Sequence, residues 1–185
     1  MKKRVLSLLL TCVMLLGLLP ATALADNEAP TTPAQETTAT VNFTAQAAGA
    51  FLCAPKFDVE VSSQEAENFG YTDSVTNGVS ALDVLVKAHE IVLEDAFTKE
   101  SASESLIIND KGFVTKLFGT ETNANGFTLN GAYPHDGTAS SSGGYNGTTV
   151  TTQAVVDNDD LEFFAYQDAK SYSDNLAWFC QGGVF

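Results

Sequence analysis

Alternation of apolar and polar residues dominates the chain from residue 41 onwards. Successive side chains of a strand point to opposite faces of a sheet, so each alternating segment has one face to bury. Two further segments are expected as strands because they are rich in β-branched or aromatic residues. The alternating segments are 41–45, 57–61, 127–129 and 161–165, and the additional strands are 112–118 and 148–156. Asn125-Gly126 and Asn130-Gly131 predict tight turns around the short strand 127–129.

One segment follows the helical period instead. Apolar positions recur every three or four residues between 82 and 93, which predicts an amphipathic helix with a stripe of Leu82, Leu85, Val86, His89 and Leu93. Ser80 and Asp83 form an S-x-x-D pair at its start, typical of a capping box. Two weaker stretches, 63–69 and 99–106, predict short helical turns.

Together these elements predict an α+β fold. We expect a mostly antiparallel sheet of five to seven strands with one main helix packed across a face. In the expected core, the apolar stripe of the helix covers a sheet face. The core residues are Leu82, Leu85 and Val86 from the helix, and Phe43, Val59, Phe113, Phe163 and their neighbours from the sheet.

The first 25 residues have the pattern of a secretory signal peptide. Lys2, Lys3 and Arg4 precede an apolar run over 5–19, and Ala23-Leu24-Ala25 is a suitable cleavage site. A lipoprotein signal ending before Cys12 is the alternative, but Thr11 stands where a smaller residue is usual.

Composition then divides the rest of the chain. Residues 26–40 are rich in Thr and Pro and have almost nothing to bury, which predicts a flexible tether. One domain over 41–180 is expected to follow, and 181–185 would be a tail or a truncated continuation. We therefore expect an extracellular or cell-surface protein.

Charge excludes several partners. The chain has 23 acidic and nine basic residues and a formal net charge of −14. Removing the first 25 residues takes three bases and no acid, so the net charge becomes −17. Such a surface repels phosphate backbones and anionic lipid, which argues against nucleic acid and membrane surfaces as partners. No second apolar run is long enough to span a bilayer, and a monomer is expected.

Segment 131–147 is the candidate binding loop. It is rich in Gly and Ser, has no hydrophobic period, and carries Tyr133, His135 and Tyr145. Aromatic side chains on such a loop offer flat faces to sugars or heterocycles at little entropic cost. Trp178 would join them if the last strand lies beside the loop. In the alternative interpretation, Tyr133 packs on Pro134 and the loop is solvated.

The residues that could support catalysis are sparse. His89 lies on the apolar stripe of the helix, which favours a structural histidine over a reactive one. His135 and Asp136 could bind a metal or move a proton, although a solvated loop pair is the plainer interpretation. Residues 157–160 suggest a calcium loop, but Leu161 occupies the next ligand position, so we expect a polar turn. The sequence implies neither a metal nor a cofactor.

Two cysteines remain after signal cleavage. Cys53 and Cys180 flank the domain of an exported chain, so a disulfide between them would join its two ends. Two separate, reduced and buried thiols are the alternative, and the sequence leaves both open.

Four motifs in order resemble a bacterial domain family of unknown function, related to the C-terminal domain of transcobalamin and gastric intrinsic factor. They are SALDVLVKA at 80–88, GFVTKLFG at 112–119, GFTLNG at 126–131 and VVDNDDLEFF at 155–164. Asn158 replaces the glycine that is usual in the acidic turn, and Tyr166 supplies the later aromatic. The resemblance implies a β-grasp-like fold of the soluble-ligand-binding type, found in surface proteins of Gram-positive gut bacteria. It identifies no corrinoid-contacting residue in this chain.

Three functions compete. The leading hypothesis is a secreted or surface-displayed, non-catalytic module that binds a small ligand, a glycan or a partner protein. The second is a structural spacer or adhesion repeat of a larger surface protein, which would need no concave site. The third is an enzyme, which would need His135 and Asp136 to converge with another acid in a cleft.

Export gives the first testable prediction. Cleavage after Ala25 should leave Asp26 as the mature N-terminus, which mass spectrometry of medium or wall fractions would detect. An intact Met1 in those fractions would rule out the signal peptide.

Overall fold

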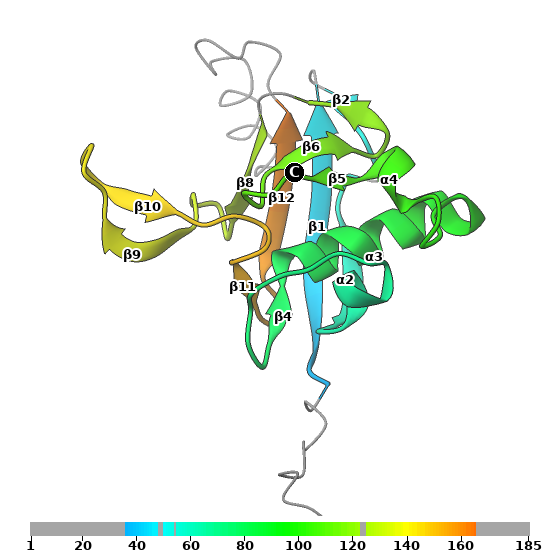
Figure 1. Cartoon of the computed structure of the whole chain (residues 1–185), viewed down its shortest axis with the longest axis horizontal. Helices are drawn as coiled ribbons and strands as arrows, with labels where there is room; N and C mark the ends of the chain where they lie inside the picture. The colour runs from blue at the N-terminus through cyan, green and yellow to red at the C-terminus, as the bar shows by residue number, and fades with distance from the viewer. Residues whose placement is uncertain (1–35, 48–49, 54, 123–124, 166–185) are drawn as a thin grey trace, which may run out of the picture. The chain divides into compact units, whose positions relative to one another are not determined.

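Two strands that are far apart in the sequence lie side by side at the centre of the main sheet (Figure 1). β1 (Thr38–Ala47) and β12 (Asp160–Ala165) pair in parallel, from Asn42 opposite Asp160 to Ala47 opposite Ala165. The structure, a computed structural model, describes residues 36–47, 50–53, 55–122 and 125–165. Within these residues strands outnumber helices, and the fold is a mixture of both.

The remaining strands of the main sheet are antiparallel to this central pair. β3 (Phe57–Ser62) and β2 (Ala50–Phe51) both pair with the edge of β1 that faces away from β12. β8 (Asn125–Leu129) pairs with the other edge of β12, with Phe127 opposite Phe163. The expected sheet, mostly antiparallel and of five to seven strands, is confirmed with five strands.

The main helix lies across one face of this sheet (Figure 1). α3 (Ala81–Leu93) agrees closely with the helix that the apolar stripe predicted. Its capping box is present: the Ser80 hydroxyl accepts from the Asp83 backbone N–H at 3.0 Å, and the Asp83 carboxylate accepts from the Ser80 N–H at 2.8 Å. These bonds fix where the helix begins and hold its first turn against the sheet.

The core lies between α3 and the alternating face of the sheet. Phe43 is fully buried, and its ring contacts those of Phe57, Phe118 and Phe163. The other buried side chains of this layer are Val41, Ala45, Val59, Val61 and Leu161 from the sheet, and Leu82, Leu85 and Val86 from the helix. The expected core is therefore confirmed except at Phe113.

Phe113 was expected in the core, and this prediction is wrong because the side chain is 52% exposed. It precedes β6 (Val114–Leu117), whose Val114 and Leu117 are buried. Neighbouring side chains of an extended chain point to opposite sides, so Phe113 points away from the core that Val114 joins. β6 also belongs to a separate three-stranded sheet with β5 (Ile107–Ile108) and β7 (Thr120–Glu121).

Short elements fill the connections. The two weak helical stretches are confirmed as α2 and α4, and a two-stranded sheet joins the start of α3 to the segment before β12. These elements are α2 (Glu65–Asn68), β4 (Val79–Ser80), the 3-10 helix η1 (Glu94–Ala96), α4 (Ala102–Ser105) and β11 (Ala154–Val155). Among the described residues, no helix combines the length and apolar character needed to cross a bilayer.

Two local predictions are wrong. The expected strand over 148–156 is reduced to β11, because the Thr149 hydroxyl and carbonyl bond to Thr152 and Gln153 and form a turn. Asn125-Gly126 is not a turn but the start of β8, where the Phe164 ring covers Gly126. A Cβ on this glycine would lie 2.8 Å from that ring. The Asn130-Gly131 turn is confirmed, with positive φ at both residues.

Segment 131–147 is not an irregular loop. It contains the exposed hairpin of β9 (His135–Ala139) and β10 (Tyr145–Gly147), which projects away from the main sheet (Figure 1). At the other end, β1 begins at Thr38, so the last three residues of the expected tether are paired with β3. The signal segment, tether residues 26–35, Tyr166 and the tail lie outside the described residues.

His89 is a structural histidine, as its place on the helix stripe predicted. Its ring is fully buried and stacks on Phe118 with centroids 3.8 Å apart. The Phe118 N–H donates to Nε2 at 2.9 Å, so Nδ1 carries the proton and donates to the Leu85 carbonyl at 2.7 Å. Burial lowers the pKa of His89 to about 4, which keeps the ring neutral at pH 7.

Leu85 tests the packing of α3 on the sheet. Replacing it with Ala should cost ~2–5 kcal/mol of unfolding free energy, because a fully buried leucine leaves a cavity. Ile91→Ala on the same helix is the matched control, since Ile91 is 43% exposed and should cost far less. Equal losses for the two variants in chemical denaturation would contradict this packing.

Candidate functional site

Two adjoining clefts lie beside the base of the β9–β10 hairpin. The larger, which we call the polar cleft, has a volume of about 830 Å³ and lies between segments 70–74, 108–112 and 147–152. The smaller, the apolar cleft, has a volume of about 230 Å³ and lies between segments 112–114, 125–127 and 133–134 and the chain at 147–150. The clefts share four lining residues: Gly112, Gly147, Thr148 and Thr149.

Two exposed aromatic side chains line the apolar cleft. Phe113 is 52% exposed and Tyr133 is 58% exposed, although large aromatic side chains are often buried in a core. The buried side chains of Val114, Phe127 and Val150 also line the cleft. Exposed aromatic rings above an apolar floor form a surface that can bury a flat ligand.

A tight turn positions Phe113. The Asn109 side-chain oxygen accepts from the backbone N–H of Lys111 and of Phe113, both at 3.0 Å, and the Asn109 N–H donates to the Phe113 carbonyl at 2.9 Å. These bonds fix the backbone on both sides of Gly112. Phe113 is thus held at the cleft by an ordered turn, and sequence reasoning missed it by assigning the residue to a strand of the core. The Asn109–Gly112 sequence NDKG was the available signal.

Gly112 is required where the clefts meet. Its φ of +80° suits glycine, and a Cβ there would lie 2.4 Å from the Thr151 hydroxyl and 2.5 Å from the Thr149 hydroxyl. These two hydroxyls are themselves within hydrogen-bond distance, at 3.0 Å. The turn that carries Phe113 is therefore packed directly onto the threonine segment.

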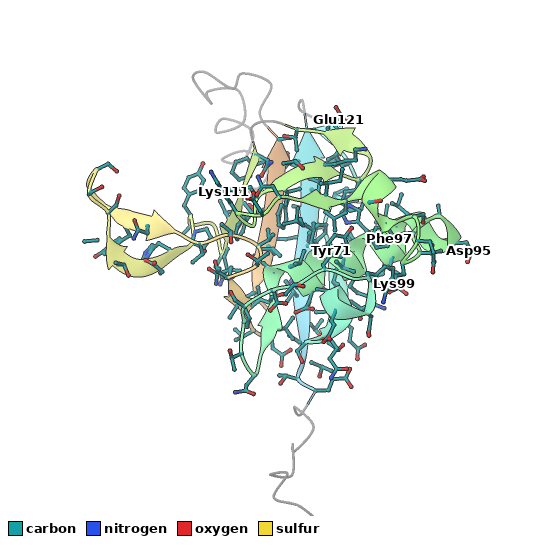
Figure 2. The ribbon with its side chains drawn as sticks, in the orientation of Figure 1. Tyr71, Asp95, Phe97, Lys99, Lys111 and Glu121 are labelled. Atoms are coloured by element: carbon teal, nitrogen blue, oxygen red, sulfur yellow. The ribbon has the colours of Figure 1, made fainter. Side chains whose placement is uncertain are left out.

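Hydroxyl, amide and charged groups line the polar cleft. Tyr71 and Lys111, both labelled in Figure 2, approach it from different segments. The Tyr71 hydroxyl donates to the Leu106 carbonyl at 2.8 Å, and burial raises the pKa of Tyr71 to about 12. The other polar lining groups are Thr72, Asp73, Ser74, Asn109, Asp110, Asp136, Thr148, Thr149, Thr151 and Thr152.

The cleft carries more negative than positive charge. Asp73, Asp110 and Asp136 contribute three carboxylates against the single ammonium of Lys111. Asp110 and Lys111 are exposed, and neither belongs to an ion pair within the described part of the chain. Both side chains are therefore available to a bound molecule.

Asp73 also belongs to a group of two carboxyls around one hydroxyl. The Ser80 Oγ lies 2.8 Å from Asp73 Oδ2 and 2.7 Å from Asp83 Oδ2. A hydroxyl has one proton to donate, so Ser80 can donate to only one of the two carboxylates at a time. Backbone N–H groups also donate to both: that of Val75 to Asp73, and those of Ala66 and Ser80 to Asp83. Burial, with the charge of Asp73 as a smaller cause, raises the pKa of Asp83, which is only 1% exposed.

The sequence-predicted site residues separate into two places. Tyr133 lines the apolar cleft, together with Pro134. His135 and Tyr145 stack on one another on the hairpin, with centroids 4.5 Å apart, and line neither cleft. The expected cluster is thus brought together only in part. Trp178 lies outside the described residues.

His135 and Asp136 do not point toward one proton or metal. The His135 Nδ1 accepts from the Gly137 N–H at 3.2 Å, and Asp136 accepts from the Thr138 N–H at 2.7 Å. Each side chain thus bonds to its own turn. In the part of the chain that the structure describes, no group of three or more His, Cys, Asp and Glu side chains is arranged to hold a metal ion.

The acidic segment 157–160 is a structural turn. Asp157 accepts from the Thr40 N–H at 2.8 Å, and the two oxygens of Asp159 accept from the Val156 N–H at 2.9 Å and the Asn130 amide at 2.7 Å. The expected polar turn is confirmed, and these bonds lead the chain into β12.

Cys53 lies half-buried after β2, with its sulfur 4.0 Å from the Ala45 carbonyl. Burial raises the pKa of the Cys53 thiol above its ordinary value. Its expected partner Cys180 lies outside the described residues, so the disulfide stays a prediction.

Comparison with known proteins adds no relative. No family model, no curated protein and no solved structure matches the chain. The two clefts and the residues that line them are therefore the features that bear on function.

The Asp73–Ser80–Asp83 group predicts a pH dependence. Because the pKa of Asp83 is raised above 3.8, the folded chain keeps a proton that the unfolded chain has lost, and the unfolding free energy falls as pH rises through the raised pKa. Asp73→Asn removes the neighbouring negative charge that helps to raise the pKa of Asp83. Denaturation from about pH 4 to about pH 7 should show a shallower fall for this variant.

Asp110→Asn is the matched control for this experiment. It removes the same charge from the same cleft, but Asp110 is exposed and does not contact Ser80. Its pH dependence should follow that of the unmodified protein. The role given to the charge of Asp73 would be contradicted if Asp73→Asn and Asp110→Asn had equal slopes.

Proposed function

We propose that the chain is an exported, non-catalytic binding module of the cell surface, and that the two clefts hold its ligand. The observation that carries the proposal is the pair of exposed aromatic rings, Phe113 and Tyr133, above an apolar cleft that adjoins a polar one. Sites for small molecules are concave, mainly apolar, and supplied with a few polar groups that orient the ligand. The adjoining clefts supply both kinds of surface.

The side-chain chemistry favours binding over catalysis. His89 is buried and neutral, and its two ring nitrogens are used in the packing of α3 against Phe118. His135 and Asp136, the pair that an enzyme hypothesis needs, bond to separate backbone groups of the hairpin. A general base must reach the proton that it removes, and these groups are engaged elsewhere.

The clefts also favour a binding module over a structural spacer. A spacer needs strength along the chain and an inert surface, and nothing in that role requires exposed aromatics above an apolar floor. Gly112 is held in a conformation that permits the tight approach of two threonines and aims Phe113 at the cleft. The fixed position of Phe113 at the cleft therefore supports a role in binding a ligand.

We also propose that the fold is β-grasp-like. In support, a parallel central pair is flanked by antiparallel strands, and a single long helix crosses one face after the first hairpin. This arrangement agrees with the resemblance to the transcobalamin-related domain family, which motivates the proposal of a ligand-binding ancestry. The signal sequence supports an extracellular location.

The test is a binding screen on the chain from residue 26 to residue 185. Ligand-observed NMR would be run on a library of small heterocycles, short peptides and oligosaccharides. Binders should be lost in Phe113→Ala and Tyr133→Ala, because each change removes one aromatic face of the apolar cleft.

Tyr145→Ala is the control, since Tyr145 is 60% exposed but stacks on His135 outside both clefts. It should keep the binders. The proposal would be overturned by a library without binders, by binding that survives in both cleft variants, or by chemical conversion of a bound compound during the incubation.

A further inference from the structure

The geometry points to a neutral oligosaccharide as the ligand, with one sugar ring on Phe113 and Tyr133 and the following rings in the polar cleft. This inference rests on the proposed function and deepens it. Three features of the described residues carry it: the aromatic faces, the mixture of donors and acceptors, and the sign of the charge.

Aromatic faces provide the first step. A sugar ring has a face of C–H groups that packs on a flat aromatic ring, while its hydroxyl groups point outward around the rim. Phe113 and Tyr133 line one small cleft from two different segments and keep more than half of their surface exposed. Their few rotatable bonds limit the entropy lost when a ligand is held.

Continuity between the clefts provides the second step. Thr148 and Thr149 line both clefts, so the two clefts adjoin along this segment and a ligand longer than one ring can contact both. The polar cleft is the larger of the two, at about 830 Å³. A chain of sugar rings fits this layout better than a single small heterocycle, which the apolar cleft alone would accommodate.

Hydrogen-bonding groups provide the third step. Each sugar hydroxyl both donates and accepts, so its site needs groups of both kinds. Carboxylates accept only, an ammonium donates only, and hydroxyls do both. Asp110, Lys111 and Thr72 are exposed examples of each kind on the lining of the polar cleft, and Asn109 adds a side-chain amide.

Charge selects among sugars. Asp73, Asp110 and Asp136 line the polar cleft with Lys111 as its only cation among the described residues, in a chain whose net charge is −14. Sulfated, phosphorylated or uronic acid sugars would be repelled by this surface. Neutral sugars meet no such barrier, and their hydroxyls can donate to the carboxylates.

The experiment titrates the chain from residue 26 to residue 185 with defined probes. Cellotetraose, maltotetraose and chitotetraose represent neutral oligosaccharides, and a chondroitin sulfate tetrasaccharide represents an anionic one of similar length. At least one neutral probe should bind in calorimetry or ligand-observed NMR, and the sulfated probe should not. Phe113→Ala and Tyr133→Ala should each weaken the neutral probe about tenfold or more.

Two variants make the result specific. Asp110→Asn changes a polar-cleft acceptor without altering the fold, and should weaken the neutral probe by a few fold. Tyr145→Ala, outside both clefts, should leave its affinity unchanged. Far-UV circular dichroism and the melting temperature would confirm that each variant is folded.

The inference would be overturned if none of the three neutral probes bound, if the sulfated probe bound more tightly than they did, or if binding persisted in both aromatic variants. Its failure is distinguishable from failure of the proposed function. Peptides or heterocycles from the library that bind through Phe113 and Tyr133 would retain the binding module while excluding the oligosaccharide.

Discussion

The structure depends on the parallel pairing of β1 with β12, which joins strands separated by more than a hundred residues in the sequence. Asn42 pairs with Asp160 and Ala47 with Ala165, and every other strand of the main sheet is added to an outer edge of this pair. A parallel pair needs a long crossover, and here the crossover contains α3 and all the cleft-forming segments. Sheet register, helix position and cleft position therefore all depend on one pairing of high sequence separation.

The clefts are made of short, locally bonded pieces of this crossover. Apart from Leu82 in α3, their lining residues come from turns, loops and short strands. They are held by bonds between side chains and backbone N–H groups: the Asn109 side chain accepts from Lys111 and Phe113, and the Thr152 hydroxyl accepts from Thr149. Such turns place side chains without burying them. Binding residues are commonly found on such loops, where the helices and strands of a rigid fold hold the loop in place.

Most of the scaffold could be predicted from the sequence, because its signals are local and repeated. Period-two spacing identified β1, β3 and β12, and the apolar stripe with its capping box identified α3 to within a residue or two. The turn at Asn130-Gly131 followed from the conformations those residues tolerate. The failures have two causes. At Gly126 a tertiary contact decides, because the Phe164 ring packs against this glycine within the strand. The threonines after residue 148 instead bond to one another within a turn, a local alternative to joining a sheet.

The candidate site was predicted only in part, and Phe113 shows why. In sequence it is a large aromatic beside Val114, and nothing local states which of the two points inward. Which of the two points inward is set by the turn that precedes them. There the Asn109 side chain accepts from the Phe113 N–H. Gly112 packs against Thr149 and Thr151, which lie nearly forty residues further along the chain. The same contact that excludes Phe113 from the core leaves it on the cleft that Tyr133 also lines. Hydrophobic periodicity cannot reveal such a candidate site. It detects residues that share a face of one element, whereas Phe113 and Tyr133 come from different segments that meet only in the folded chain.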